Sequence, residues 1–215
     1  MISSVAKIFV PGKAFLEAIE DVPAVSVVYF IFIREGWRLI DGLNLKSADL
    51  ERPPAFNGAD LMYIGMSPHS IQARLSSHFC SDPRMSSFRR TLGLLLKHEL
   101  NLDMHACNQR AKFQFGSGEA RLTDWIVDRG YVSYILSPSA ETLEEFLIKS
   151  FHPPLNISFR KTHPLSRHLM LRSKSLRLAR AAGGNRPSEY VTLNERRAGS
   201  VRNHRTDRPL RTLTQ

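Results

Sequence analysis

The sequence predicts an α+β fold in which a small central mixed β-sheet is flanked by helices and followed by a basic C-terminal extension. Residues 25–33 (VSVVYFIFI) form a nearly unbroken run of β-branched and aromatic side chains, which is typical of a central strand covered on both faces. Apolar residues spaced three and four apart recur further along the chain and indicate several helices. The chain of 215 residues is long enough for one domain with an appendage.

The first expected element is a short helix that follows the turn-forming residues Val10-Pro11-Gly12 and carries Phe15 and Ile19 on one face. The central strand comes next, and a second strand is expected at about residues 61–64. The connection between the two strands, residues 34–60, contains several glycines and prolines. We therefore predict that it is a long loop.

Two helices are expected after the second strand. Ser67-Pro68 indicates a helix start, because serine accepts a hydrogen bond from the free N–H groups of the first turn and proline has no donor to satisfy. This helix is expected to run to about Phe79. A second helix covers residues 86–100, where apolar side chains share one face, and residues 111–115 are expected to form a strand.

The next elements are a helix at residues 119–129 and a strand at residues 131–136. Gly130 is expected to end the helix in the left-handed conformation, which costs glycine least. A further helix is expected to start at Ser137-Pro138 and to be terminated by Pro153-Pro154.

The positive charge of the chain lies almost entirely after residue 166. The whole chain has a formal net charge of +10, and residues 167–215 contain 12 Lys and Arg against 3 Asp and Glu. We expect a domain at residues 1–166, with a motif core at about 25–157, and a basic, partly disordered tail at residues 167–215. The tail can add affinity for phosphates, but the bulk charge of the domain does not indicate nucleic-acid binding.

Cysteine content and hydropathy give expectations about location. The chain has two cysteines, too few for a disulfide framework or a four-cysteine zinc site. No apolar run reaches the roughly 18 residues that cross a bilayer, and the first residues lack the order of a secretion signal. We therefore expect a cytoplasmic protein that has no contact with a membrane.

Five short motifs occur in a characteristic order. They are Val27-Val28-Tyr29, Tyr63-Ile64-Gly65, the stretch SPHSIQARLSSH at residues 67–78, Glu144 in EEFLIK, and Asn156 after Pro153-Pro154. Together they resemble the GIY-YIG endonuclease superfamily, although Val27 and Val28 replace the first glycine and isoleucine. Segments at residues 86–93 (SSFRRTLG), 122–125 (LTDW) and 163–164 (His-Pro) resemble a subgroup of small bacterial members.

The resemblance implies a Mg²⁺ or Mn²⁺ endonuclease that uses one ion to hydrolyse DNA. The implied catalytic residues are Tyr29, Tyr63, Arg74 and Glu144, with support from His78, Asn156 and Gly65. Their chemistry fits phosphodiester hydrolysis, which requires an activated water and neutralisation of phosphoryl and leaving-group charge.

Each catalytic side chain has an expected role. Glu144 is a hard oxygen ligand that can hold one ion keeping most of its waters. The planar guanidinium of Arg74 matches phosphate geometry. Tyr63 is the candidate for accepting the proton of the water, and Tyr29 positions the water or shares that role, because a phenol needs cationic neighbours to act as a base.

Other interpretations of these residues stay open. The tyrosines can be ordinary half-buried strand residues, and Asn156 can simply cap a turn. Arg89 and Arg90 are either a solvated helix face or DNA contacts, and we retain them as candidate nucleic-acid-binding residues. The main alternative function is a catalytically weak nucleic-acid-binding module that keeps the fold. A further alternative is an interaction protein that acts through its basic tail. We expect DNA as the partner and no small-molecule organic cofactor.

Overall fold

The computed structural model describes most of the chain between residues 25 and 171. The described residues are 10–12, 14, 17, 25–43, 45, 51–79, 86–106, 113–159, 164–171 and 174. The chain divides into two units, residues 1–180 and 181–215, and every described residue belongs to the first.

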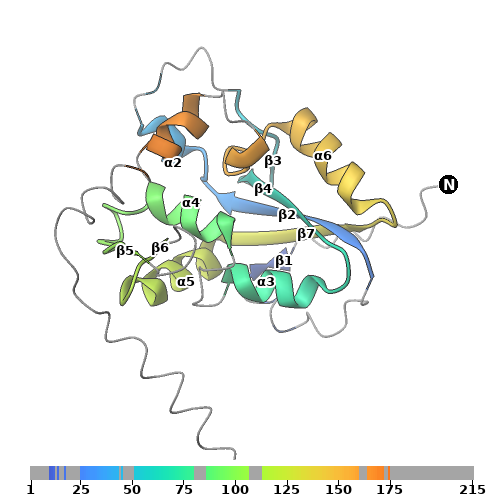
Figure 1. Cartoon of the computed structure of the whole chain (residues 1–215), viewed down its shortest axis with the longest axis horizontal. Coiled ribbons are helices and arrows are strands. Elements are labelled where there is room, and N and C mark those ends of the chain that lie inside the picture. Colours follow the sequence, from blue (N-terminus) through green and yellow to red (C-terminus); the bar gives the residue numbers. More distant parts are fainter. Residues whose placement is uncertain are drawn as a thin grey trace, which may run out of the picture. The chain divides into compact units, whose positions relative to one another are not determined.

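Five strands of the described residues form one antiparallel sheet in the order β1-β7-β2-β4-β3 (Figure 1). The strands are β1 (Val10–Pro11), β2 (Val27–Arg34), β3 (Ala55–Phe56), β4 (Ala59–Ser67) and β7 (Gly130–Leu136). β2 is the central strand, and it pairs with β4 on one side and β7 on the other. The register places Tyr29 opposite Gly65 of β4 and opposite Tyr134 of β7.

The helices and a second small ladder complete the described fold. The helices are α2 (Arg38–Asp41), α3 (Ile71–Phe79), α4 (Ser87–Leu95), α5 (Gly118–Arg129), α6 (Ala140–Phe151), the 3-10 helix η4 (Ile157–Phe159) and a helical segment at residues 164–171. The ladder pairs β5 (His105–Ala106) with β6 (Phe113–Gln114). Leu165 and Leu169 of the segment at 164–171 are buried in the main core, so the packed structure continues past residue 166.

The two faces of β2 are buried in two separate hydrophobic clusters. Alternate side chains of a strand point to opposite faces, so Tyr29 and Ile31 face a larger cluster while Val28 and Phe30 face a smaller one. α3, α4 and α5 supply the larger cluster and α6 supplies the smaller, so the sheet lies between these two groups of helices (Figure 1). Burial of both faces explains why β2 is apolar almost throughout.

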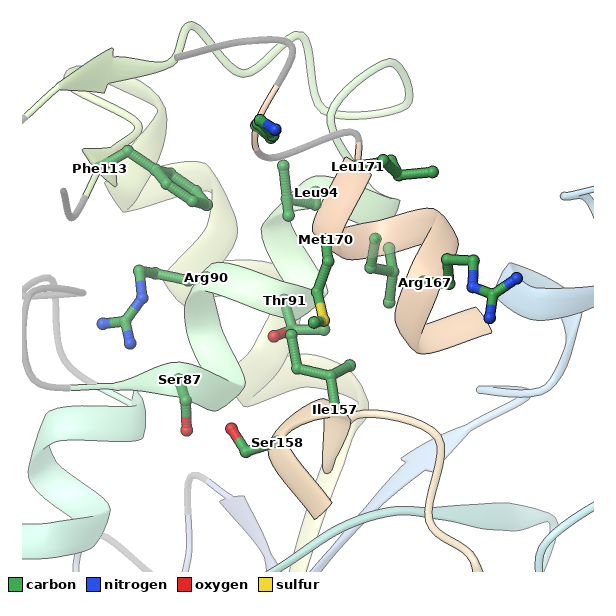
Figure 2. Close-up of a pocket in the computed structure, with 12 residues that line it drawn as sticks. Ser87, Arg90, Thr91, Leu94, Phe113, Ile157, Ser158, Arg167, Met170 and Leu171 are labelled. Atoms are coloured by element: carbon green, nitrogen blue, oxygen red, sulfur yellow. The ribbon is translucent and has the colours of Figure 1, made fainter. Parts of the chain in front are cut away.

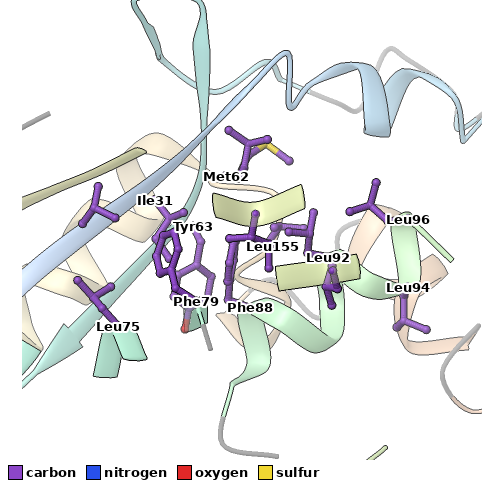
Figure 3. Packing of buried hydrophobic residues seen from close by; sticks show 14 of the residues in the cluster. Ile31, Met62, Tyr63, Leu75, Phe79, Phe88, Leu92, Leu94, Leu96 and Leu155 are labelled. Atoms are coloured by element: carbon purple, nitrogen blue, oxygen red, sulfur yellow. The ribbon is translucent and has the colours of Figure 1, made fainter. Parts of the chain in front are cut away.

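The larger cluster fixes α3 and α4 against the sheet beside the two motif strands. Figure 3 shows Leu75 and Phe79 of α3 and Phe88 of α4 packed near Ile31 and Tyr63. Each fully buried leucine or phenylalanine side chain contributes about 1.5–3 kcal/mol relative to an exposed one. The position of α3 over β2 and β4 therefore rests on apolar burial.

A β-bulge in β4 sets the direction of the second motif. Ile31 pairs with Tyr63 but Phe32 pairs with Leu61, so Met62 is an extra residue in β4. As a result Met62 and Tyr63 both face the larger cluster. The bulge thus keeps Tyr63 on the same face of the sheet as Tyr29.

The α+β class is confirmed, but the expectation of a mixed sheet is wrong. All strand pairs among the described residues are antiparallel. β4 and β7 run in the same direction, yet they lie on opposite sides of β2, so no parallel pair forms. Gly130 was also expected to be left-handed, whereas it is extended and begins β7. Its lack of a side chain matters because a Cβ there would lie 2.5 Å from the carbonyl oxygen of Ile126.

Other expected elements are shortened or fall outside the described residues. The connection at residues 34–60 contains the short α2 and β3, and the strand expected at 111–115 is reduced to β6. Phe15 and Ile19 of the first expected helix lie outside the described residues, as does the tail after residue 174. None of the described helices combines the length and apolar character that crossing a membrane requires.

Candidate active site

Tyr29 on β2 and Tyr63 on β4 lie side by side, with ring centroids 6.4 Å apart. Gly65 provides the space for this arrangement. A Cβ at Gly65 would lie 2.2 Å from the hydroxyl oxygen of Tyr29 and 2.9 Å from Cε1 of Tyr63. The glycine of the second motif therefore supports the site by leaving room for the Tyr29 ring, and both tyrosines are buried.

Arg74 on α3 joins the two phenols. Its Nε donates a hydrogen bond to the hydroxyl oxygen of Tyr29 over 3.2 Å, and its side chain also hydrogen-bonds to Tyr63. Burial raises the pKa of Tyr29 well above its usual value, Tyr63 raises it further, and the charge of Arg74 opposes both effects. Among the described residues, Arg74 is thus the group that favours negative charge on the Tyr29 oxygen.

His78 lies one turn after Arg74 on α3 and is fully buried. Its Nε2 is 2.7 Å from the hydroxyl oxygen of Tyr29, and its Nδ1 is 2.7 Å from Oγ of Ser86. Burial lowers the pKa of His78 well below its usual value, and the charges of Arg74 and Arg89 lower it further. The imidazole is therefore neutral around pH 7.

Glu144 on α6 belongs to the same group of side chains. It is half-buried, accepts a hydrogen bond from the backbone of Met66 and interacts electrostatically with Arg74 and Tyr29. Burial raises the pKa of Glu144, while Arg74 and the Met66 hydrogen bond lower it. By contrast, the neighbouring Glu145 is exposed and forms an ion pair of 2.6 Å with Lys149.

The available ligands suit one hard cation that retains most of its water. Glu144 is the carboxylate that lies beside Arg74, and the described residues contain no cluster of three or more His, Cys, Asp or Glu that could hold a metal. Magnesium dehydrates reluctantly and is commonly bound by one or two carboxylates, with water and substrate phosphate as further ligands. The Glu144 carboxylate therefore fits this kind of ion.

Asn156 holds β4 and does not point at the tyrosine hydroxyls. Its Oδ1 accepts a hydrogen bond of 2.9 Å from the N–H of Ile64, and its Nδ2 donates one of 2.7 Å to the Ile64 carbonyl. Next to it, the N–H of Leu155 donates to the carbonyl of Met62 over 3.0 Å. Ile64 lies between Tyr63 and Gly65, so Asn156 fixes the backbone that carries the second motif.

The structure places Arg89 in the interior, which contradicts the expectation that it contacts DNA. Its side chain is 0% exposed. Its guanidinium donates to the carbonyl of His78 over 3.1 Å and to the carboxylate of Glu119 over 2.8 Å. The spacing of apolar residues put Arg89 on the outer face of α4, but Glu119 provides a buried partner that the pattern of one helix cannot reveal.

Arg90, in contrast, lines an open cavity of about 510 Å³. Figure 2 shows Arg90 and Arg167 on opposite sides of this cavity, with Leu94 and Met170 between them. The complete lining is Ser87, Arg90, Thr91, Leu94, Phe113, Ile157, Ser158, Arg167, Leu169, Met170, Leu171 and Lys174. Ser87 belongs to the cavity lining, and its Oγ lies 3.2 Å from the hydroxyl oxygen of Tyr63.

The structure thus brings Tyr29, Tyr63, Arg74, His78 and Glu144 together. Sequence reasoning missed Ser86, Ser87 and Glu119. Ser86 stands at the start of α4, and its Oγ accepts the N–H of Arg89 over 3.0 Å, so its capping role was recognisable in the sequence. The contact between Ser86 and His78 depends on the packing of two helices and carries no sequence signal.

Comparison with known protein families identifies a match. A family model described as the GIY-YIG catalytic domain matches residues 27–177 of the 215. The matched range begins with the strand of Tyr29 and contains Tyr63, Arg74, His78, Glu144 and Asn156. Neither a curated protein nor a solved structure matches the chain.

Proposed function

We propose, from the premise that this chain belongs to the GIY-YIG family of catalytic domains, that it is a divalent-metal-dependent endonuclease that hydrolyses DNA phosphodiester bonds. The family makes a nuclease the expected activity. The observation that best supports the proposal is that Arg74 hydrogen-bonds to both tyrosine hydroxyls and lies beside the Glu144 carboxylate. These groups match the requirements of phosphodiester hydrolysis.

Arg74 is proposed to bind the oxygens of the phosphoryl group. The guanidinium keeps its charge at any pH at which the protein is folded and offers several donors in one plane. Its Nε bonds to Tyr29, and the remaining N–H groups can bind the oxygens of the phosphate as their charge grows. Arg74 therefore links the group that activates water to the group under attack.

A tyrosine oxygen is proposed to accept the proton of the attacking water. Tyr29 is the candidate, because its oxygen lies within hydrogen-bond distance of Arg74 and His78 and the charge of Arg74 opposes the burial that raises its pKa. An N–H donor on that oxygen favours the phenolate. Tyr63, which bonds to Arg74 and Ser87, then positions the water or the phosphate.

Glu144 is proposed to be the ligand of one Mg²⁺ or Mn²⁺ ion. When bound, such an ion polarises the phosphate and stabilises the departing alkoxide. The Met66 hydrogen bond orients the carboxylate, and Arg74 keeps it ionised against the effect of burial.

The cavity lined by Ser87 is proposed to bind the DNA that flanks the cleaved bond. Cationic residues at its edge, Arg90, Arg167 and Lys174, can neutralise backbone phosphates, and the hydroxyls of Ser87 and Ser158 can bind phosphate or sugar oxygens. Because Ser87 both lines the cavity and contacts Tyr63, a strand bound there would lie near the catalytic group.

The test is cleavage of supercoiled plasmid by the purified full-length protein as Mg²⁺ is titrated. Glu144→Ala should abolish the metal-dependent nicking, and Glu145→Ala is the matched control because its carboxylate is exposed and paired with Lys149. Equal loss in both variants would contradict the assignment of Glu144. Plasmid binding without any nicking by the unaltered protein would instead favour a nucleic-acid-binding module that has kept the fold.

A further inference from the structure

One wall of the cavity lined by Ser87 is a single face of α4. The lining residues of this helix recur three and four positions apart, and they are Ser87, Arg90, Thr91 and Leu94. Side chains at this spacing lie next to one another on a helix surface. The wall therefore combines a guanidinium and two hydroxyls with an aliphatic side chain.

The opposite wall is a face of the helical segment that begins at residue 164. Its lining residues follow the same spacing, and they are Arg167, Met170, Leu171 and Lys174. Met170 is 36% exposed and Leu171 is 60% exposed, although both side chains are large and apolar. They adjoin further apolar lining at Leu94 and Ile157 (Figure 2). A contiguous apolar surface of this kind is typical of a binding site.

The charge and size of the cavity restrict the chemistry of its ligand. Among its twelve lining residues, all of them in the described part of the chain, Arg90, Arg167 and Lys174 are cationic and none is Asp or Glu. Its volume of about 510 Å³ falls within the range of about 300–1,000 Å³ that is usual for cavities enclosing a small organic group. The lining thus complements a ligand that has an apolar part and negative charge beside it.

An unpaired nucleotide has this combination, whereas paired DNA does not. In a duplex the base faces are stacked on one another, so a protein contacts phosphates, sugars and base edges. A nucleotide released from the stack exposes the face of its base beside its phosphate. Base faces pack on apolar and aromatic side chains with little dependence on sequence.

We propose that this cavity binds an unpaired nucleotide of the DNA strand. The base packs against the apolar lining, and the phosphates beside it contact Arg90 and Arg167, which lie on opposite sides of the cavity. Ser87 lines the cavity and lies 3.2 Å from the Tyr63 hydroxyl, so the bound nucleotide lies near the catalytic group. The inference rests on the proposed function and names its substrate class, which is DNA with unpaired nucleotides beside the cleaved bond.

The first measurement is binding of dye-labelled oligonucleotides to the full-length, metal-free protein by fluorescence anisotropy. It compares a single strand with a strand of equal length that lacks bases at its central positions. The two strands carry the same phosphate charge, so a difference in affinity reports contacts with the bases. We expect the strand with bases to bind at least about tenfold more tightly. Equal affinity would overturn the proposal, as would equally tight binding of a free nucleoside monophosphate.

The second measurement removes apolar lining without changing the charge of the chain. The test variant carries both Met170→Gln and Leu171→Gln. The matched control is Phe146→Gln, because Phe146 is 63% exposed on α6 and does not line the cavity. Both changes affect exposed side chains, and thermal unfolding checks that the variants fold.

We expect the double variant to bind the single strand about tenfold more weakly and to bind a duplex of the same sequence with unchanged affinity. Phe146→Gln should change neither affinity. Unchanged binding of the single strand by the double variant, or an equal loss for the duplex, would overturn the proposal. If the double variant does not fold, the comparison of strands with and without bases still decides.

Failure of this inference is distinguishable from failure of the proposed function, because binding is measured without metal. A protein that shows base-dependent binding but nicks no DNA with Mg²⁺ or Mn²⁺ contradicts the endonuclease and leaves the nucleotide-binding cavity standing. A protein that nicks plasmid but binds strands with and without bases equally contradicts the nucleotide-binding cavity and leaves the endonuclease standing.

Discussion

Nε of Arg74 lies 3.2 Å from the hydroxyl oxygen of Tyr29, so a helix and the central strand of the sheet meet at a charged hydrogen bond. Arg74 also bonds to Tyr63 on the next strand. One side chain therefore sets the spacing of both phenols, and a change at Arg74 is expected to affect both.

Arg74→Lys tests whether a planar guanidinium is needed. Lysine keeps the charge but offers a point donor that cannot hold two tyrosine hydroxyls and a phosphate in one plane. We expect kcat for plasmid nicking to fall by about 10²-fold, the usual loss when one transition-state donor is removed. Thermal unfolding should change little. Arg38→Lys is a matched control, because Arg38 is exposed and pairs with Glu35; a similar loss of activity in that variant would contradict the prediction.

Gly65→Ala tests the space beneath the Tyr29 ring. The new Cβ would lie 2.2 Å from the Tyr29 oxygen, so the ring or the strand must shift. We expect overpacking to lower the free energy of unfolding by about 1–3 kcal/mol in urea titrations and to remove most of the nicking activity. Gly42→Ala is the control, since among the described residues its Cβ would meet only the carbonyl oxygen of Arg38, at 3.6 Å. Equal stability of the two variants would contradict this account.

The pH dependence of nicking tests the role of Tyr29. Burial raises the pKa of the Tyr29 hydroxyl well above its usual value, so the phenol is protonated near pH 7 and only a small fraction is phenolate. Below that pKa the phenolate fraction rises tenfold per pH unit. We expect log kcat at saturating Mg²⁺ to increase with pH through the neutral and alkaline range with a slope of about one. Tyr29→Phe should remove the activity, and a flat profile in the unaltered protein would exclude a tyrosine base.

Arg89 and Arg90 are neighbours in sequence with opposite expected roles. Arg89→Met leaves the buried Glu119 carboxylate without its partner, and we expect the free energy of unfolding to fall by about 3–5 kcal/mol. Arg90→Met should leave stability nearly unchanged but weaken DNA binding and reduce its salt dependence, because Arg90 lines the cavity. Denaturant titrations and binding at several salt concentrations check both outcomes. The reverse assignment would contradict the burial of Arg89.

The predictable part of the fold is the part encoded by local patterns. The apolar run of β2, the helix over residues 118–129 and the order of the motifs were recognisable because alternation, helical spacing and residue type are properties of short segments. The direction of strand pairing was not recognisable, because it depends on which side of β2 the strand β7 joins after three helices. The Met62 bulge was hidden for the same reason, since the register between two strands decides it.

The residues of the candidate site also divide into those that the sequence reveals and those that only the packing of elements reveals. Side chains with motif spacing, such as Tyr63 and Arg74, could be named from the sequence, and the structure brings them together. Partners contributed by other elements could not be named, and these include Ser86 for His78 and Glu119 for Arg89. Arg89 was misplaced because a charged residue in an amphipathic helix is usually solvated, whereas here a carboxylate from α5 compensates its burial.

The two hydrogen bonds between Asn156 and the backbone of Ile64 also bear on the solubility of the protein. Beyond the short pairing with β3, the outer edge of β4 would present free N–H and C=O groups, which are a template for adding a strand from another molecule. Asn156 occupies both groups of Ile64, and the N–H of Leu155 occupies the carbonyl of Met62. The residues that follow the double proline thus act as a substitute strand, and they protect the sheet from edge-to-edge aggregation.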